Sequence, residues 1–446
     1  MKLLRELPKV DKFISHPVFE GLCTPLLTQI AREAIESLRE AILKEEVSSV
    51  DEESLIQRVK NTYDAFFEPS LKPLINATGV ILHTNMGRSL ISECLLERAK
   101  PIICNYSNLE YNLQEGCRGE RYEHVSGHLK NLLHVEDVLV VNNNAAAVFL
   151  ILNTFAKNKE VVVSRGELVE IGGSFRIPEV MKQSGALLHE VGATNKTKPT
   201  DYANAISENT AMLMKVHQSN FAMEGFSEDV NYKTIKALAH KNGLIDYYDL
   251  GSGYIPKLPY NLGNREASLD EILACQPSLI SFSGDKLFGS VQAGIIAGSK
   301  ELIDALKKNQ LLRMLRVDKI TLSLLEESIK AYLKEEYEAI PTLWLLFQNV
   351  EDLTQRALRV RACVGEHYCD VVQSDTYMGG GTLPNRKFPT IALHIKGKAS
   401  ALEKKFREHY VIGRIENEQF LLDFRSLLPS VESQLIQTIK TVLDLK

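Results

Sequence analysis

The sequence predicts an α/β protein with a mainly parallel, doubly wound sheet. Apparent strands and helical patterns alternate between residues 138 and 283, and this alternation is typical of sheets that bind ligands at the carboxyl ends of their strands. A helical segment precedes this region, and helices with a smaller α/β segment follow it. Since 446 residues are too many for one compact core, we expect three parts, at 1–68, 69–310 and 311–446.

Composition indicates a soluble globular protein of the cytoplasm. Hydrophobic residues make up 44% and charged residues 24% of the chain. The formal net charge of −5 gives no overall attraction to nucleic acid or to a membrane. The 7 cysteines are scattered without a C-x-x-C pair or a Cys/His metal spacing, which argues against a zinc site. No apolar run is long enough for a signal peptide or a membrane span.

Residues 1–68 are expected to form a helical module. Apolar residues between Leu26 and Val47 recur at three- and four-residue steps, and a second helical pattern runs from Leu55 to Phe67. The module holds 9 lysines and arginines against 13 acids. It therefore lacks the basic character expected of an RNA-binding domain. Composition alone favours a packing or oligomerisation module.

The segment Pro73–Leu90, PLINATGVILHTNMGRSL, carries more polar side chains than a strand needs in order to fold. Arg88 follows a glycine within it. Two interpretations of Arg88 stay open, a solvated charge and a buried side chain that faces an anion.

Six short apolar runs predict strands. They are VLVV (138–141), VVVS (161–164), LLHEV (187–191), MLMKV (212–216), LIDYYD (244–249) and ISFS (280–283). The first run leads into Asn142–Asn144, and a helix is expected from about Ala145. The N–H groups at a helix N-terminus suit a phosphate, although the asparagines could also serve only as helix caps. Neither a dinucleotide-binding nor a P-loop glycine motif is present.

The last of these runs leads into a turn with one lysine, SFSGDKLFGSVQAG (281–294). Lys286 follows Ser283 by three residues, and Asp249 ends an earlier predicted strand. A cofactor aldehyde needs a neutral lysine amine, its phosphate needs hydroxyls and N–H groups, and its pyridine nitrogen needs a carboxylate. The order of these residues is that of a fold-type-I pyridoxal phosphate (PLP) enzyme, with Lys286 as the Schiff-base lysine. The alternative is an ordinary solvated turn.

After Leu306 the pattern changes to long helices. Arg313 and Arg316 are three residues apart in LLRMLRVDK, so in a helix they share one face. Most such pairs are solvated, but the surrounding Leu and Met and the following Val-Asp-Lys favour a shared anion. A long helix is then expected to about Glu366, followed by a small α/β domain with an apolar run at 390–395. Gly379–Gly381 cannot lie inside a helix, and it is either a hinge or a loop near the site.

Several segments together resemble bacterial selenocysteine synthase, the L-seryl-tRNA(Sec) selenium transferase family. They are INATGVILHTNMGR, VVNNNAAAV, VVVSRGELVEIGGSFRIPEVM, DLGSG, SGDKLFGSVQAGII, LRMLRVDK and GGGTLP. The resemblance implies conversion of seryl-tRNA(Sec) to selenocysteinyl-tRNA(Sec) with PLP and selenophosphate, through an aminoacrylyl-tRNA. It also implies a homo-oligomer, a ring of dimers such as a decamer, with its sites at the dimer interface and the tRNA held by the N-terminal module.

The resemblance also assigns site residues. It makes Lys286 the PLP lysine and Asp249 the partner of the pyridinium nitrogen. The other catalytic residues that it implies are Arg88, Asp285, Arg313 and Arg316. Together with the residue patterns, it gives as further cofactor-binding residues Ser283, Asn143, Asn144, Ala145 and Thr194.

Some assignments stay open. Where the family usually has Gly-Thr-Thr-Asn, this chain has Ala193 before Thr194, so one hydroxyl is missing. Residues 165–176 and His217 are candidates for stacking on the PLP ring. Arg425 could meet a substrate acyl group or only pair with an acid.

Two alternative functions also stay open. The first is a PLP-dependent ammonia-lyase or β-eliminating enzyme that acts on a free small molecule. The N-terminal module and the arginine pair argue against it, and the lack of a basic N-terminal patch argues for it. The second is a catalytically silent scaffold that binds tRNA or a partner. Such a scaffold would be expected to have lost Lys286 or Asp249, and both are present.

Overall fold

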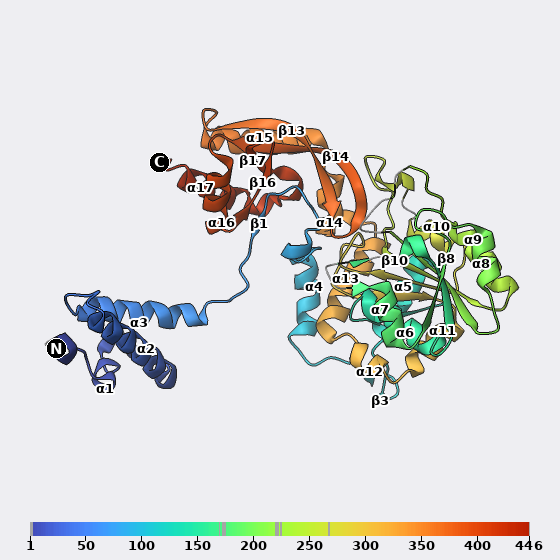
Figure 1. The fold of residues 1–446 in the computed structure, drawn as a ribbon, viewed down its shortest axis with the longest axis horizontal. Helices are drawn as coiled ribbons and strands as arrows, with labels where there is room; N and C mark the ends of the chain where they lie inside the picture. Colours follow the sequence, from blue (N-terminus) through green and yellow to red (C-terminus); the bar gives the residue numbers. More distant parts are fainter. Residues whose placement is uncertain are drawn as a thin grey trace. The chain divides into compact units, whose positions relative to one another are not determined.

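The computed structural model describes residues 3–168, 170–171, 175–218, 223, 225–265 and 268–445. The chain divides into two compact units, Met1–Pro73 and Leu74–Lys446 (Figure 1). None of the described helices combines the length and the apolar character that a membrane span requires.

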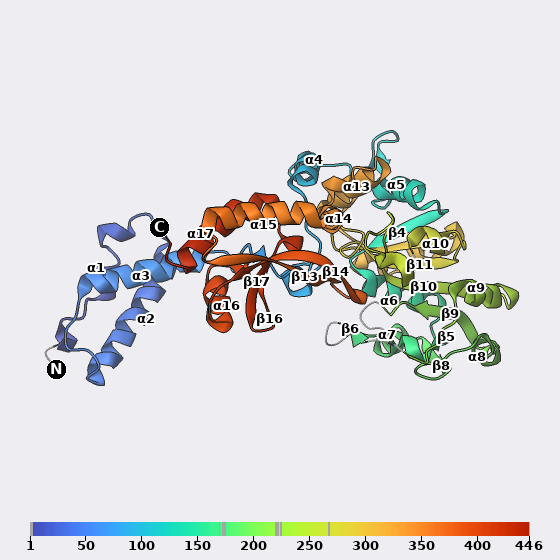
Figure 2. The same cartoon turned by 90° about the horizontal axis from the view of Figure 1, so that it is seen from above.

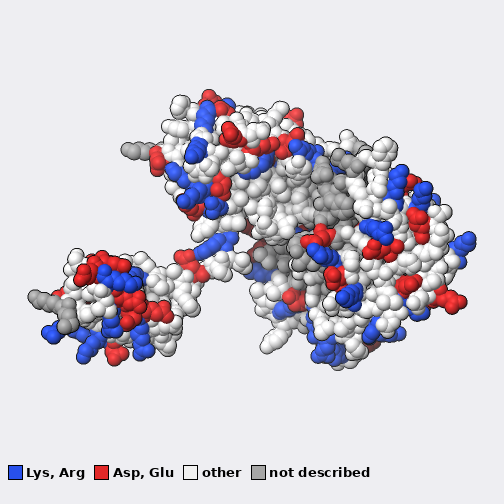
Figure 3. All heavy atoms as spheres, in the orientation of Figure 1, with Lys and Arg blue, Asp and Glu red and all other residues white. Residues whose placement is uncertain are grey.

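The N-terminal unit is a small helical bundle. Its two longer helices, α2 (Thr24–Leu43) and α3 (Glu52–Phe67), pack together around buried residues that include Leu27 and Val59. The predicted end of the first helix at Val47 is wrong, because Glu45 takes a φ of 60° and the helix stops before it. Acidic and basic side chains mix on the face of this unit drawn in Figure 3. The short helical turns that complete the unit are η1 (Leu3–Arg5), α1 (Val10–Phe13) and η2 (Pro17–Phe19).

A seven-stranded sheet forms the centre of the second unit, in the order β4-β12-β11-β10-β9-β5-β8. All of its strands are parallel to one another except β12. The six predicted strands and the mainly parallel sheet are therefore confirmed, whereas β12 was not predicted. The bounds are β4 (Asp137–Val141), β5 (Glu160–Ser164), β8 (Leu187–Val191), β9 (Thr210–Val216), β10 (Ile245–Ser252), β11 (Leu279–Ser283) and β12 (Gly294–Gly298).

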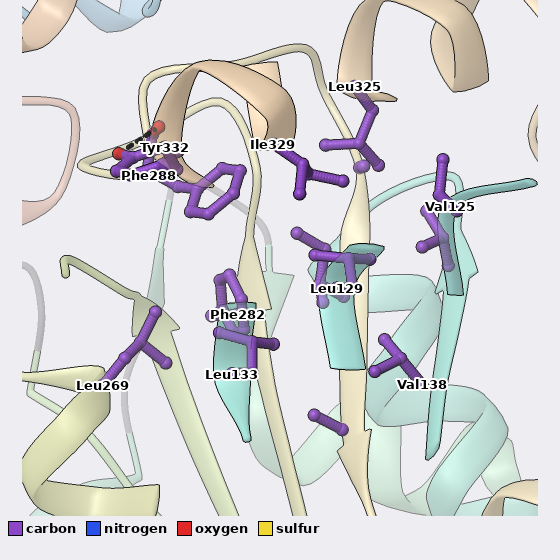
Figure 4. Packing of buried hydrophobic residues seen from close by; sticks show 14 of the residues in the cluster. Val125, Leu129, Leu133, Val138, Leu269, Phe282, Phe288, Leu325, Ile329 and Tyr332 are labelled. Carbon is purple, nitrogen blue, oxygen red and sulfur yellow. Dashed lines mark hydrogen bonds between the residues drawn. The ribbon is translucent and has the colours of Figure 1, made fainter. Parts of the chain in front are cut away.

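Helices cover both faces of this sheet (Figures 1 and 2). Alternate residues of β4 face opposite sides, since Leu139 packs in one core cluster and Val138 in another. The first cluster includes residues of α6, α7 and α11, and the second includes residues of α5, α10 and α13. In the second cluster, Leu129, Phe282 and Ile329 gather in one apolar group (Figure 4). The doubly wound architecture is confirmed.

The helices and 3-10 turns of this region have the following bounds. They are α4 (Glu93–Ile103), α5 (Glu123–Leu133), α6 (Asn144–Phe155), η4 (Arg165–Glu167), α7 (Ile177–Ser184), α8 (Pro199–Ala205), α9 (Tyr232–Lys241), η5 (Leu262–Arg265), α10 (Leu269–Leu273), α11 (Lys300–Lys308), α12 (Leu312–Leu315) and α13 (Lys319–Leu333). Two short strand pairs accompany them, β2 (Tyr111–Asn112) with β3 (Cys117–Arg118) and β6 (Glu170–Ile171) with β7 (Phe175–Arg176).

The long helix predicted to about Glu366 is wrong, because three helices and a 3-10 turn take its place. Glu335 has a φ of 58° just after α13, Pro341 begins α14, and the Asn349 side chain caps α15. Proline cannot donate the N–H that a continuous helix needs, so the chain turns there. The new elements are η6 (Tyr337–Ala339), α14 (Pro341–Phe347) and α15 (Val350–Val364).

A four-stranded antiparallel sheet, β13-β14-β17-β16, forms the C-terminal part of the unit. The apolar run predicted at 390–395 lies in β14. Residues of α15, α16 and α17 share a core cluster with this sheet. The bounds are β13 (Cys369–Gly379), β14 (Thr382–Ile395), α16 (Ala399–Glu408), β15 (Val411–Ile412), β16 (Arg414–Glu416), β17 (Gln419–Asp423), η7 (Phe424–Ser426), η8 (Pro429–Val431) and α17 (Glu432–Val442).

The polar segment 73–90 runs along this C-terminal part before it reaches Arg88. Its strand β1 (Ile75–Asn76) pairs with β15, and its 3-10 turn η3 (Thr84–Met86) lies just before Arg88. Leu82 is fully buried, and its N–H donates to the carbonyl of Met378. Gly379–Gly381 form the turn between β13 and β14, with φ of 81°, 65° and 68°. A Cβ at the first of these glycines would lie 2.9 Å from the Leu82 carbonyl oxygen, so this turn is a loop packed on the segment that leads to Arg88.

Candidate active site

Lys286 lies in the turn between β11 and β12, at the carboxyl end of the parallel strands. Its side chain is buried, with 5% of the residue exposed, and Ser283 and Asp285 are buried beside it in the sequence. The turn is closed by its own backbone, since the Gly289 N–H donates to the Lys286 carbonyl at 2.8 Å. The solvated turn considered as an alternative is therefore wrong.

Asp249 lies near the end of β10, the strand beside β11. Its Oδ1 accepts hydrogen bonds from the Asn144 side-chain amide at 2.7 Å and from the Gly251 N–H at 3.1 Å. Burial raises the pKa of Asp249, and the Asn144 hydrogen bond and the charge of Lys286 oppose that rise. The carboxylate is thus held in place by neutral donors in a buried position.

The N-terminus of α6 lies beside these two residues. Asn143 caps the helix, since its side chain accepts from the Ala146 N–H at 2.8 Å, so the helix-cap interpretation is confirmed for this asparagine. The Asn144 side chain instead reaches Asp249. A Cβ at Gly294 would lie 2.2 Å from the Asn143 carbonyl oxygen, and Gly294 pairs with Ser283 across β11 and β12. Only a glycine therefore lets the helix N-terminus come this close to the Ser283 strand.

Arg88 reaches the same turn from the 73–90 segment. It has a φ of 63°, and its Nη1 donates to the Asp285 carboxylate at 2.9 Å. The side chain is 29% exposed. The anion that Arg88 faces in this chain is therefore Asp285. This favours the interpretation of Arg88 as a side chain that faces an anion over that of a solvated charge.

The expected helical face shared by Arg313 and Arg316 is wrong. The helix α12 ends at Leu315, and Arg316 follows it in an extended conformation with ψ of 144°. Arg313 is exposed, whereas Arg316 is half-buried and its Nη1 donates to Glu110 at 3.1 Å. In the described part of the chain, no hydrogen bond or ion pair joins either arginine to the Lys286 turn.

Glu110 collects several guanidinium groups. Arg121 donates to it through Nε and Nη2, and Arg118 donates at 3.2 Å. The Arg121 hydrogen bond holds the pKa of Glu110 below its usual range, although burial opposes this. Three arginines, Arg118, Arg121 and Arg316, thus share the Glu110 carboxylate. Their surplus of positive charge suits an oxyanion.

Thr194 and His217 are two further candidates from the sequence for this site. Thr194 and Ala193 are exposed in the loop after β8, the edge strand, and the Thr194 carbonyl packs against Gly166. The His217 N–H donates to the Asp249 main-chain carbonyl at 2.9 Å, so this histidine lies next to the candidate site. Of the stacking candidates at 165–176, residues 169 and 172–174 lie outside the described residues.

Arg425 has a structural role. It is fully buried, and its guanidinium donates to main-chain carbonyls, including that of Pro389 at 2.8 Å. It also donates to the Tyr260 hydroxyl at 3.2 Å. Burial lowers its pKa. Of the two roles left open for Arg425, pairing of its side chain with an acid is not found among the hydrogen bonds and ion pairs of the described residues.

The family of the chain follows from its similarity to known proteins. The family model described as "SelA: L-seryl-tRNA selenium transferase" matches residues 74–428. The L-seryl-tRNA(Sec) selenium transferase of Aliarcobacter butzleri is 56% identical over 448 residues, covering 100% of this chain and 99% of the relative. That of Sulfurimonas denitrificans is 55% identical over 446 residues, covering 99% of each. The chain belongs to this family.

A solved structure supports the fold. The structure of D-glucosaminate-6-phosphate ammonia-lyase aligns with a TM-score of 0.59 at 17% identity, covering 86% of this chain and 98% of the other. The fold is that of the fold-type-I PLP enzymes, as the sequence predicted. At this level of identity the likeness concerns the fold alone.

The residues of this selenium transferase family member fit a phosphate-bearing aldehyde cofactor. They supply a buried amine at Lys286, a buried carboxylate at Asp249 and the N-terminus of a 12-residue helix. Within the described residues, the Asn144 Oδ1 and the His83 Nδ1 are buried polar atoms without a hydrogen-bond partner. Unsatisfied buried polar atoms are costly, so a ligand with polar groups would be stabilised here.

The sequence did not point to several residues around this site. Ser89 bonds the main chain of Lys286, and Thr342 bonds Ser89. Beyond the Lys286 turn, Glu110 binds both Arg316 and Arg121. For Ser89, its place directly after Arg88 was a usable signal. For the others, nothing local distinguishes them from ordinary surface residues.

Proposed function

We propose that this chain is a PLP-dependent enzyme that converts seryl-tRNA(Sec) to selenocysteinyl-tRNA(Sec) with selenophosphate as the selenium donor. The relatives that carry the name L-seryl-tRNA(Sec) selenium transferase match it over its full length. The observation that carries the proposal within the structure is the buried pair of Lys286 and Asp249 at the carboxyl ends of β11 and β10. A buried lysine beside a fixed carboxylate is what a pyridoxal cofactor requires.

In this proposal, Lys286 binds the cofactor aldehyde through Nζ, and Asp249 binds the ring nitrogen. The N-terminus of α6, from Asn143 to Ala145, binds the phosphate together with the hydroxyl of Ser283. Bound PLP would supply an aldehyde that takes up the seryl amino group and a ring that accepts electrons from Cα. Thr194 belongs to the proposed set through the family resemblance.

The residues of the chain then move protons and hold charges. Lys286 Nζ removes the proton from the seryl Cα, and Asp249 keeps the ring nitrogen protonated. The Cβ–O bond breaks and the seryl oxygen leaves as water. A Cβ–Se bond forms in its place, and a water molecule is consumed when the Se–P bond of the donor breaks and phosphate is released. Atoms and charges therefore balance without an oxidant or a reductant.

The arginines bind the selenium donor in this proposal. Arg88, Arg313 and Arg316 suit a multiply charged oxyanion because a guanidinium group offers a planar pair of donors. Arg88 is bound to Asp285 and Arg316 to Glu110. The donor must therefore share these arginines with internal carboxylates or displace them. Of the proposed catalytic residues, Arg88 and Asp285 lie nearest to Lys286, because Asp285 directly precedes it and Arg88 binds Asp285.

We also propose that the N-terminal unit holds the tRNA and that the enzyme is a ring of dimers such as a decamer. The expected module, 1–68, carries 9 basic residues against 13 acids. Non-specific attraction to phosphates should then be small, and the salt dependence of tRNA binding by this unit should be weak. Binding would depend on shape and on individual contacts.

One assay tests the proposal. Purified protein loaded with PLP is mixed with seryl-tRNA(Sec) and its visible spectrum is followed, after which selenophosphate is added and the aminoacyl group is analysed. A spectral change with the tRNA, followed by selenocysteine on the tRNA, is expected. A protein that ignores the tRNA but eliminates from free amino acids would replace this function by the small-molecule lyase and keep the role of Lys286.

A further inference from the structure

Arg88 and Ser89, which are adjacent in the 73–90 segment, bind the adjacent residues Asp285 and Lys286 in the lysine turn. The Arg88 side chain donates to the Asp285 carboxylate at 2.9 Å. The Ser89 N–H donates to the Asp285 main-chain carbonyl at 3.3 Å, and the Ser89 hydroxyl donates to the Lys286 carbonyl at 3.0 Å. The Arg88–Asp285 and Ser89–Lys286 pairs are each 197 residues apart in the chain. The pairing therefore attaches the lysine turn to the segment that carries Arg88.

The Ser89 hydroxyl both donates and accepts a hydrogen bond. It donates to the Lys286 carbonyl, and it accepts from the Thr342 hydroxyl at 3.1 Å. Thr342 is 1% exposed and lies in the first turn of α14. A buried hydroxyl that loses its acceptor costs about 1–3 kcal/mol. The chain from Thr342 through Ser89 to Lys286 is thus satisfied only when all its members are present.

The contacts of Ser89 and Arg88 have different targets. Arg88 binds a side-chain carboxylate, whereas Ser89 binds only the main chain of the turn. Loss of Arg88 therefore changes charge at the site, while loss of Ser89 changes the position of the Lys286 backbone and leaves the charges in place. The two residues should have different kinetic signatures.

We infer that Ser89 is a positioning residue for Lys286: through the Lys286 carbonyl it fixes where Nζ stands relative to the cofactor aldehyde and the substrate Cα. This inference rests on the part of the proposed function in which Lys286 carries the cofactor. It does not depend on the tRNA or on selenium. Catalytic groups lose about 10- to 100-fold in rate when their position shifts by an ångström or less.

The test compares three variants with the wild type. Ser89→Ala removes the hydroxyl, and Ser89→Thr keeps it. Ser184→Ala is the control, because the Ser184 hydroxyl also donates to a carbonyl, that of Met181, and accepts from an N–H, that of Ala186. Ser184 is buried and Ser89 is half-buried, so the control removes a hydroxyl that is at least as well shielded from water. For each protein, the rate of PLP attachment to the cofactor-free protein is followed by visible absorbance, alongside the melting temperature, kcat and the KM for selenophosphate.

For Ser89→Ala we expect PLP attachment and kcat to fall by about 10- to 100-fold while the KM for selenophosphate changes by less than about twofold. The Ser89→Thr protein should recover most of both rates. The Ser184→Ala protein should lose a similar amount of thermal stability and keep both rates. If Ser89→Ala attaches PLP at the wild-type rate, or if Ser184→Ala slows attachment as much, the inference is overturned.

A milder variant keeps the inference testable if Ser89→Ala does not fold. Thr342→Val preserves the shape of the side chain and removes its hydroxyl, so it should slow PLP attachment in the same direction by about two- to fivefold. An unchanged attachment rate in this variant counts against the inference. A protein in which Ser89 controls PLP attachment but which gives no selenocysteine would retain the inference and refute the proposed function.

Discussion

Two buried lysines lie at the large sheet, Lys215 near the end of β9 and Lys286 in the turn after β11, and their surroundings differ. Lys215 is the penultimate residue of β9, and its Nζ donates at 2.9 Å to each of Glu167, Asp229 and the Val230 carbonyl. Burial lowers its pKa, but the charge of Glu167, together with Tyr248 and Asp229, outweighs burial and the pKa is raised. Lys215 is thus held as a charged ammonium group.

The acids around Lys286 are bound by other side chains. Asp285 is bound by Arg88, and Asp249 by the Asn144 amide. The Arg88 charge therefore compensates that of Asp285, and the neutral Asn144 amide stabilises the Asp249 carboxylate through a hydrogen bond. A lysine at the ligand-binding edge of a sheet is therefore not distinguished by burial, which both share. The carboxylates differ in their hydrogen bonds: Glu167 and Asp229 accept from Lys215 itself, whereas Asp285 accepts from Arg88 and Asp249 from Asn144.

Removal of Lys286 tests the different roles of the two lysines and should have the largest effect on activity. For Lys286→Ala we expect selenium transfer to fall on the order of 1,000-fold or more and the visible absorbance with PLP to disappear. The free energy of unfolding should change by only about 1 kcal/mol, because Asp285 keeps its bond to Arg88 and Asp249 keeps its bond to Asn144. Absorbance titration and urea unfolding measure the two effects. Retained absorbance would assign the cofactor to another residue.

The converse variant is Lys215→Met. It should cost about 3–5 kcal/mol of stability, because Glu167 is left buried without its cation. Activity per folded molecule should remain near that of the wild type. If the variant instead unfolds normally and loses the visible absorbance, the roles of the two lysines are reversed.

The loss in Lys215→Met should depend on pH. Burial raises the pKa of Glu167, and removal of Lys215 takes away the largest effect that opposes that rise, leaving the Val216 N–H bond. In the folded state, Glu167 then keeps its carboxyl proton to higher pH than it does in the unfolded state. The variant is therefore most stable below the unfolded pKa of Glu167 and loses stability as pH rises through its folded pKa. Urea unfolding at several pH values measures this, with Lys215→Met/Glu167→Gln as the control that should lose the pH dependence.

The sequence predicted the strands, Lys286 and Asp249 because these signals are local. A short apolar run followed by turn residues identifies a strand end without knowledge of the fold. The contact between Ser89 and Lys286 spans 197 residues, and no local pattern encodes such a distance. The face expected for Arg313 and Arg316 failed for a related reason, since periodicity cannot show that α12 has only four residues.

Asp249→Asn tests the compensated carboxylate. Burial raises the pKa of Asp249, so without PLP its ionised form destabilises the fold as pH rises through the folded pKa. The cofactor-free variant should therefore be at least as stable as the wild type at neutral pH, and less stable relative to it only in acid. Addition of PLP should raise the melting temperature of the wild type more than that of the variant. Turnover should fall on the order of 100-fold. An equal gain from PLP in both proteins would remove Asp249 as the partner of the ring nitrogen.

The smallest effects separate the two arginines that the sequence treated as a pair. Arg313 is exposed, so Arg313→Ala should weaken selenophosphate binding by about tenfold at low salt and less at high salt, with stability unchanged within about 0.5 kcal/mol. Arg316→Ala should weaken binding similarly and also lower stability by up to about 1 kcal/mol, because Glu110 loses one of its partners. Arg407→Ala, which breaks an exposed ion pair with Glu403, is the control and should change neither. If Arg316→Ala leaves donor binding intact, Arg316 serves only to hold Glu110. The anion would then be bound by residues outside the cluster, in the same way that Lys215 serves only to hold Glu167.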